Sequence, residues 1–155
     1  MRGPAPSQIP WPPILLMATF VAGWIGQTYA PVPWPEAFNL TARGAGIVLT
    51  VVAMAIIGWA ALEMRRADTT IMPHVAATTL VTTGPFRFSR NPIYLADSLL
   101  LVGLALIFLK PWIALLVPVF AGLVTWLSII PEEHHLEIEF GQVFRDYKRQ
   151  TRRWV

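Results

Sequence analysis

The sequence predicts an all-α integral membrane protein with about four transmembrane helices, and three observations lead to this prediction. Of the 155 residues, 55% are hydrophobic and 14% are charged, whereas about 25% of the residues of an average soluble domain are charged. The mean hydropathy is +0.53. Four apolar segments of 17 to 19 residues approach the length of about 20 residues with which a helix crosses a bilayer. Soluble, disordered and collagen-like classes are thereby excluded.

The four apolar segments cover residues 14–30, 44–62, 93–109 and 112–130. None of them alternates apolar and polar residues with a period of two, so the pattern favours helices over the strands of a membrane barrel. A cleaved signal peptide is the less favoured interpretation of the first segment, because three more apolar segments follow. We therefore predict a single membrane domain over residues 1–155.

The basic residues predict the orientation of these helices. With four spans, ten Lys and Arg residues fall on one side of the membrane, whereas only Arg43 and Lys110 fall on the other. Cytoplasmic loops carry an excess of Lys and Arg. Both termini and the long connection over residues 63–92 are therefore expected in the cytoplasm.

Two motifs are expected to meet at the cytoplasmic face. Lys110 and Pro111 leave room only for a tight turn between the last two apolar segments, which predicts an antiparallel hairpin. The hairpin would place residues 90–92 beside the adjacent pair Glu132 and Glu133. After this pair, apolar residues recur every three or four positions, so residues 132–150 are predicted to form an amphipathic helix that roofs the site near the lipid headgroups.

Charged residues at this face allow more than one interpretation. Arg87 and Arg90 could hold a carboxylate or phosphate through paired hydrogen bonds, or could anchor the loop to headgroups. Glu132 and Glu133 could bind ribose hydroxyls or an amino group, cap the following helix, or form a structural salt bridge. Asp97 lies inside the third apolar segment, where an ionisable residue is a functional candidate unless it only reaches toward the interface.

Several other kinds of site are disfavoured. The chain has no cysteine, which excludes disulfides and thiol chemistry. The adjacent residues His134 and His135 would point to different helix faces, so no metal site is predicted. The glycine pairs lie in apolar runs without a preceding strand, unlike a Rossmann or phosphate-binding loop. The basic residues are spread over loops and tail, which does not indicate a nucleic-acid partner.

The second half of the chain, over about residues 73–155, resembles a known family through two motifs. The first is the run LVTTGPFRFSRNPIYL at residues 80–95. The second begins about 37 residues later as EE-x-x-L-x-x-x-FG-x-x-F-x-x-Y, from Glu132 to Tyr147. Together they resemble the isoprenylcysteine carboxyl methyltransferase family, whose superfamily includes the phospholipid (phosphatidylethanolamine) N-methyltransferases.

The resemblance implies a membrane-embedded methyltransferase that uses S-adenosylmethionine, bound at the cytoplasmic face. The acceptor would be small and lipophilic: an isoprenylcysteine-type carboxylate, or a phospholipid amine such as phosphatidylethanolamine. Membrane lipids would be its partners. The cofactor-binding positions that it implies are His74, Leu80, Val81, Gly84, Asn91, Tyr94, Glu132 and Glu133. The candidate catalytic residues are Arg90, Asn91, Tyr94 and Asp97.

Two positions depart from the family pattern. Asn91 stands where many members have histidine, and an amide can hydrogen-bond a carboxylate but cannot act as a base. Ala96 stands where glycine is usual, so its methyl group could narrow the approach of the cofactor to the helix. A carboxylate acceptor would need no base, whereas an amine must lose a proton, for which Asp97 or a glutamate is a candidate.

Two other functions remain as alternatives. One is an NADPH-dependent membrane reductase of the sterol reductase type, because those enzymes resemble this family in their C-terminal part. That function would predict a pocket for a 2′-phosphate and a longer chain with more spans. The other is a non-enzymatic membrane bundle, which predicts that nothing binds among the converging arginines and glutamates.

Overall fold

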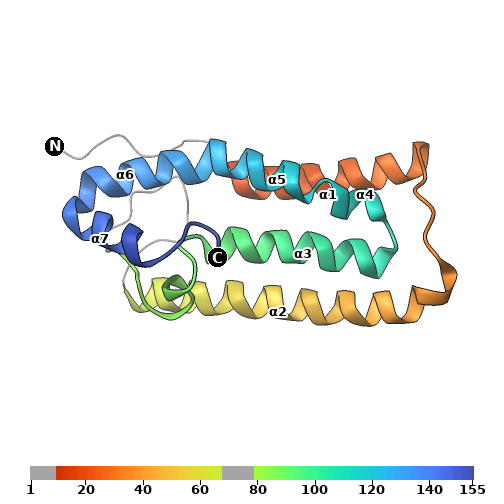
Figure 1. Ribbon diagram of the computed structural model, residues 1–155, viewed down its shortest axis with the longest axis horizontal. Helices are drawn as coiled ribbons and strands as arrows, with labels where there is room; N and C mark the ends of the chain where they lie inside the picture. The colour runs from red at the N-terminus through yellow and green to blue at the C-terminus, as the bar shows by residue number, and fades with distance from the viewer. Residues whose placement is uncertain (1–9, 68–78) are drawn as a thin grey trace.

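The computed structural model describes residues 10–67 and 79–155, and this part of the chain is helical without any strand. Figure 1 shows the long helices lying side by side, with the segment before α3 and the helices α6 and α7 at one end of the bundle. The elements are α1 (Trp11–Tyr29), η1 (Glu36–Phe38), α2 (Asn39–Arg66), η2 (Gly84–Arg87), α3 (Pro92–Phe108), α4 (Pro111–Leu115), α5 (Val117–Val124), the π-helical turn η3 (Thr125–Ile129), α6 (Ile130–Phe140) and α7 (Gln142–Gln150).

Two helical runs in the described residues are long and apolar enough to cross a membrane. They are Glu36–Arg66 and Pro111–Phe140, with mean hydropathies of 2.3 and 2.4 over their most apolar windows. The helix α3 is apolar but has only 17 residues. The structure therefore supports an all-helical protein with two candidate membrane-spanning helices, beside which α1 and α3 pack.

The chain reverses direction between α3 and α4. Leu109 adopts a left-handed backbone conformation with a φ of 53°, and the Lys110 N–H donates to the Ala105 carbonyl at 2.8 Å. Pro111 then begins α4, at a position where a backbone N–H would have no acceptor within the helix, so the lack of this group in proline costs no hydrogen bond. From there α4, α5, η3 and α6 follow one another back along α3 to the opposite end of the bundle (Figure 1).

Small residues bring α2 and α3 close together. The buried residues of α2 are all alanine or glycine: Ala42, Gly46, Ala53 and Ala60. A Cβ added to Gly46 would lie 2.6 Å from the Gly103 carbonyl oxygen of α3. Small residues at such positions let helix backbones approach closely, as is typical of helix packing in membranes.

The C-terminal region differs from the single amphipathic helix predicted over residues 132–150. It forms two helices, α6 and α7, because Gly141 between them adopts a φ of 52° that other residues rarely reach. In addition, α6 begins before the glutamate pair as a continuation of η3. The wide π-helical turn directly before Pro131 accommodates a residue that has no N–H to donate. The turn at Gly141 folds α7 back, so that Phe144 and Tyr147 are buried.

Candidate functional site

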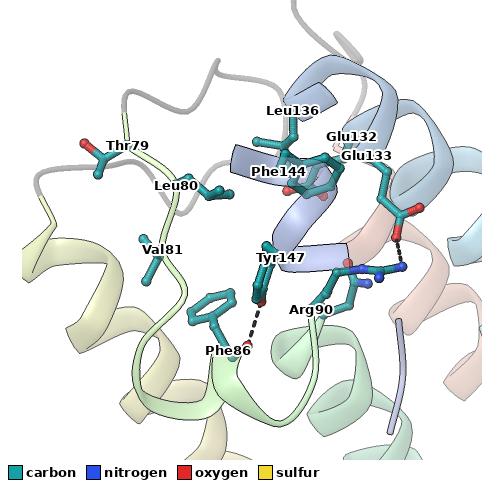
Figure 2. A pocket seen from close by; sticks show the side chains of 11 residues that line it. Thr79, Leu80, Val81, Phe86, Arg90, Glu132, Glu133, Leu136, Phe144 and Tyr147 are labelled. Carbon is teal, nitrogen blue, oxygen red and sulfur yellow. Dashed lines mark hydrogen bonds and ion pairs between the residues drawn. The ribbon is translucent and has the colours of Figure 1, made fainter. Parts of the chain in front are cut away.

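A pocket lies at the end of the bundle where the two sequence motifs meet (Figure 2). Its walls come from the segment before α3, from α6 and from α7. The residues that line it are Thr79, Leu80, Val81, Phe86, Arg90, Asn91, Glu132, Glu133, Leu136, Phe144 and Tyr147. Apolar and aromatic side chains therefore surround one cationic and two acidic residues, which is a typical composition for a small-molecule site.

The segment before α3 is fixed at both ends. On one side the Thr83 hydroxyl donates to the Glu63 carboxylate of α2 at 2.7 Å. Gly84 has a φ of 60°, and a Cβ there would lie 2.5 Å from the Glu63 side chain. On the other side the Tyr147 hydroxyl of α7 donates to the Phe86 carbonyl at 2.6 Å (Figure 2). Burial raises the pKa of Tyr147 to about 12, so its hydroxyl remains a donor at neutral pH.

The central polar contact joins two arginines to one glutamate. The Nη2 of Arg90 donates to Glu133 Oε1 at 2.9 Å. Arg153 donates from Nε to the same oxygen at 3.1 Å and from Nη2 to Glu133 Oε2 at 2.7 Å. Burial alone would raise the pKa of Glu133, but the hydrogen bonds from Arg153 and Arg90 outweigh it, and the pKa lies below its usual value. Glu133 is therefore held as a carboxylate.

Arg90 uses most of its side-chain donors in hydrogen bonds to other groups of the protein. Its Nη1 donates to the carbonyls of Lys148 and Thr151, at 3.1 and 2.8 Å. Its Nε is buried and has no partner among the described residues. The predicted role of Arg90 was to hold a ligand's carboxylate or phosphate with paired donors. Among the described residues, the hydrogen bonds of Arg90 leave Nε and one N–H of Nη2 for such a contact.

Glu132 accepts fewer hydrogen bonds than Glu133 among the described residues. Its Oε2 accepts one hydrogen bond, at 3.2 Å, from the hydroxyl of Tyr94 in the first turn of α3. Burial raises the pKa of this carboxyl to about 7, with a further increase from the charge of Glu133 and a decrease from the Tyr94 hydrogen bond. Glu132 therefore changes its charge near neutral pH, whereas Glu133 does not.

The structure brings most, but not all, of the predicted site residues together. Leu80, Val81, Arg90, Asn91, Glu132 and Glu133 line the pocket, and Tyr94 reaches it through Glu132. Two other predicted residues do not line the pocket. Gly84 shapes the turn below the pocket, and Asp97 is buried within α3, about one turn further along than Tyr94. His74 falls outside the described residues.

Asn91 makes contacts that its sequence position did not predict. Its side-chain Nδ2 donates to the Arg153 carbonyl at 3.0 Å, and its backbone N–H donates to the Ser89 hydroxyl at 3.1 Å. Arg87, in contrast, is exposed. In the described part of the chain, no group of three or more His, Asp or Glu side chains could hold a metal ion.

Sequence reasoning missed Arg153 and the aromatic wall of the pocket as site residues. A signal existed for the wall, because Leu136, Phe144 and Tyr147 belong to the second motif and share one face by their spacing. No comparable signal marked Arg153, which is one of five basic residues in the last eleven positions. Only the reversal at Gly141 brings it to Glu133.

The comparisons with known proteins identify the family of the chain. The model of the phospholipid methyltransferase family matches residues 41–143, which are 103 of the 155 residues of the chain. The matched region contains α3, the segment before it and the glutamate pair. No curated protein and no solved structure matches the chain. The family match confirms the resemblance to the isoprenylcysteine and phospholipid methyltransferase superfamily, and the chain belongs to the phospholipid methyltransferase family.

Proposed function

We propose that this membrane methyltransferase uses S-adenosylmethionine to methylate a small lipophilic acceptor. One observation above all supports the proposal: the pocket combines the Arg90–Glu133 ion pair, the less engaged Glu132 and a wall of aromatic side chains. This pocket is formed by the two motifs on which the family resemblance rests. Family membership supports methyl transfer in a membrane.

The residues present fit the chemical groups of this cofactor. S-adenosylmethionine has a purine, ribose hydroxyls, an amino group, a carboxylate and a sulfonium. Phe86, Phe144 and Tyr147 offer an aromatic surface for the purine. Glu132 can accept hydrogen bonds from hydroxyl or amino groups, and the unpartnered Nε of Arg90 can donate to the carboxylate. The bound cofactor would supply an electrophilic methyl group, which the protein needs only to orient toward the acceptor.

The helices suggest how the protein sits in the membrane. We propose that α1, α2, α3 and the run from α4 to η3 each cross it, with the last two as a hairpin. The apolar residues 111–130 contain no charged residue, and the polar part of α6 begins after them. With the basic residues distributed as described, the termini and the pocket face the cytoplasm. The cofactor would enter from the cytosol and the acceptor sideways from the lipid.

The acceptor is proposed at the level of its chemistry. The matched family favours a phospholipid amine such as phosphatidylethanolamine over an isoprenylcysteine-type carboxylate. An amine must lose a proton before or during methyl transfer. Asp97 is the candidate base, because it is a buried carboxyl about one helical turn from Tyr94.

The test is calorimetric titration of the detergent-purified protein with S-adenosylhomocysteine, with NADPH as the control titrant. We expect saturable binding of the first compound only. Glu132→Gln should weaken this binding about tenfold, or 1.4 kcal/mol, whereas Glu139→Gln on the exposed side of α6 should not. Because the pKa of Glu132 is about 7, the wild-type affinity should decrease as the pH falls from 8 to 6.

The outcomes separate the possible functions. Binding of NADPH alone would indicate the reductase, and binding of neither compound would contradict an S-adenosylmethionine site. Equal affinities in wild type and Glu132→Gln would exclude Glu132 from the site while leaving the methyltransferase proposal intact.

A further inference from the structure

The last residues of the chain lie across the segment that begins α3. We call residues 151–154 the C-terminal strap. The Arg90 N–H donates to the Arg152 carbonyl at 2.9 Å, and Arg90 Nη1 donates to the Thr151 carbonyl at 2.8 Å. The Arg153 carbonyl accepts from Asn91 Nδ2 at 3.0 Å and from the Ser89 hydroxyl at 3.2 Å. Three successive residues, 89–91, are thus bonded to the strap.

The strap is itself fixed in place at both ends. At its beginning, Thr151 is buried and its N–H donates to the Tyr147 carbonyl of α7 at 3.0 Å. At its end, Trp154 packs against the apolar core formed largely by α3 and α5. The backbone of residue 153 therefore has a defined position, from which its side chain extends to Glu133.

The Arg153 side chain provides most of the hydrogen bonds that Glu133 accepts. Its Nε and Nη2 contact the two carboxylate oxygens, so the pair has the two-pronged geometry that makes arginine–carboxylate contacts strong and directional. Arg90 adds the third bond, to Oε1. The Glu133 side chain is only 10% exposed, so its charge is compensated within the protein.

The two adjacent glutamates are consequently in different states. Glu133 accepts three charge-assisted hydrogen bonds from arginines, whereas Glu132 accepts one from the neutral Tyr94 hydroxyl. Both line the same pocket, and their neighbouring charges repel each other. The direction in which Glu133 points therefore influences what Glu132 can bind.

We propose that Arg153 is a positioning residue of the cofactor site: it fixes Glu133 in its pair with Arg90, so that Glu132 is the carboxylate that meets the ligand. This inference rests on the proposed function. Through the Arg153 side chain the strap acts on the site, although no strap residue lines the pocket.

Removal of the Arg153 guanidinium would leave Glu133 with one of its three hydrogen bonds. The charged groups then facing Glu133 would be Arg90 from the segment before α3 and Glu132 from its own helix. With Arg90 as its remaining cation, Glu133 would compete with the ligand for Arg90, and its less compensated charge would repel Glu132. Its pKa would rise, because Arg153 is a main cause of the low value.

The experiment compares Arg153→Gln with Arg152→Gln by calorimetric titration with S-adenosylhomocysteine. Both variants lose one positive charge and keep the backbone carbonyls of the strap, but the Arg152 residue is exposed. We expect about tenfold weaker binding for Arg153→Gln, and an affinity within about twofold of wild type for Arg152→Gln. Arg153→Lys, which keeps the charge but not the paired donors, should lie between them.

Two further measurements distinguish positioning from a structural role alone. In Arg153→Gln the acidic decrease in affinity should begin at a higher pH than in wild type, because the less compensated charge of Glu133 raises the pKa of Glu132 further. In a Glu133→Gln background, Arg153→Gln should cause no additional loss of affinity, because its effect acts through Glu133. All titrations are made well below the melting temperature of each variant.

Several results would overturn the inference. Wild-type affinity and an unchanged pH profile in Arg153→Gln, even with a lower melting temperature, would show that the strap only stabilises the fold. A full loss that persists in the Glu133→Gln background would show that Arg153 does not act through Glu133. If the wild type itself fails to bind S-adenosylhomocysteine, the proposed function fails and this inference fails with it.

Discussion

Two regions of α3 are stabilised in opposite ways. In its middle, α3 packs against α2 through glycine and alanine, and the contact depends on the absence of side chains. At its beginning, α3 adjoins the network of Arg90, Glu133 and Arg153, where the contact depends on charges and directional hydrogen bonds. Added volume should therefore disrupt the first region, and a change of charge without a change of shape should disrupt the second.

The difference also separates stability from function. The α2–α3 contact lies among apolar residues away from the pocket, so its changes should affect unfolding without altering the ligand site directly. The network borders the pocket, and its changes should affect both. Variants that change stability without changing ligand binding would show whether the two regions of α3 are separate in this way.

The largest effect is expected for Gly103→Ala in the α2–α3 contact. A Cβ at Gly103 would lie 2.5 Å from the Thr50 hydroxyl and 2.9 Å from the Gly46 carbonyl oxygen, so the helices must separate. We expect the free energy of unfolding to fall by about 2 kcal/mol or more, as in other overpacked cores. Chemical denaturation of the detergent-solubilised protein measures this change.

The matched control is Gly58→Ala in the same helix pair. No atom lies within 4 Å of a Cβ at Gly58, and alanine is favoured over glycine within a helix by about 1 kcal/mol or less. This variant should be as stable as wild type or slightly more stable. Equal losses in the two variants would contradict close packing as the source of the Gly103 effect.

The next effect is expected for Glu133→Gln in the network. The amide keeps the shape of the side chain but leaves Arg90 and Arg153 facing each other without an anion. Breaking a fully buried ion pair costs about 3–5 kcal/mol. Because the Arg153 side chain is 38% exposed, we expect the free energy of unfolding to fall by only about 2 kcal/mol. Glu137→Gln is the control. Its pair with Lys148 is more than one-third exposed, so it should lose less than about 1 kcal/mol.

The pH dependence of stability provides a second test of this network. The pKa of Glu133 in the folded protein lies below its usual value of 4.5. The ionised carboxylate therefore stabilises the fold above the usual value, and this contribution is lost as the pH falls through the lower, folded pKa. The stability difference between wild type and Glu133→Gln should shrink as the pH falls below about 4.5. A difference that does not change on acidification would contradict the assigned ion pairs.

The sequence was sufficient to predict the region of the site but not its full set of contacts. Apolar segments of fixed length and a very short connection after the third indicated that Arg90 and the glutamate pair would meet. The structure places Arg90 2.9 Å from Glu133. This inference needed only the lengths of apolar runs, which are set by the bilayer and by helix geometry.

The contacts of the C-terminal residues could not be predicted in the same way. The three- and four-residue spacing of apolar side chains continues through Gly141, so periodicity alone predicted one helix. A single backbone angle at Gly141 divides it and redirects the chain. The same reversal brings Arg153 to a glutamate that is 20 residues earlier. Such a contact depends on the tertiary path of the chain, which local patterns do not encode.

The smallest effect is expected for Tyr147→Phe, which tests the contact that closes α7 over the pocket. The variant keeps the buried ring and removes the hydroxyl that donates to the Phe86 carbonyl at 2.6 Å. A buried hydrogen bond contributes about 0.5–1.5 kcal/mol net, so we expect a loss of about 1 kcal/mol in chemical denaturation. Tyr29→Phe is the matched control, because Tyr29 is 85% exposed and its substitution should change nothing measurable.

This last variant also extends the comparison between the two regions of α3. If α7 and the segment before α3 form one unit with the pocket, loss of the Tyr147 hydroxyl should lower both the stability and the affinity for S-adenosylhomocysteine. Gly103→Ala should lower the stability alone. An affinity equal to that of wild type in Tyr147→Phe, together with the expected loss of stability, would assign α7 to the fold rather than to the site. The polar end of α3 would then depend on the Arg90, Glu133 and Arg153 network alone.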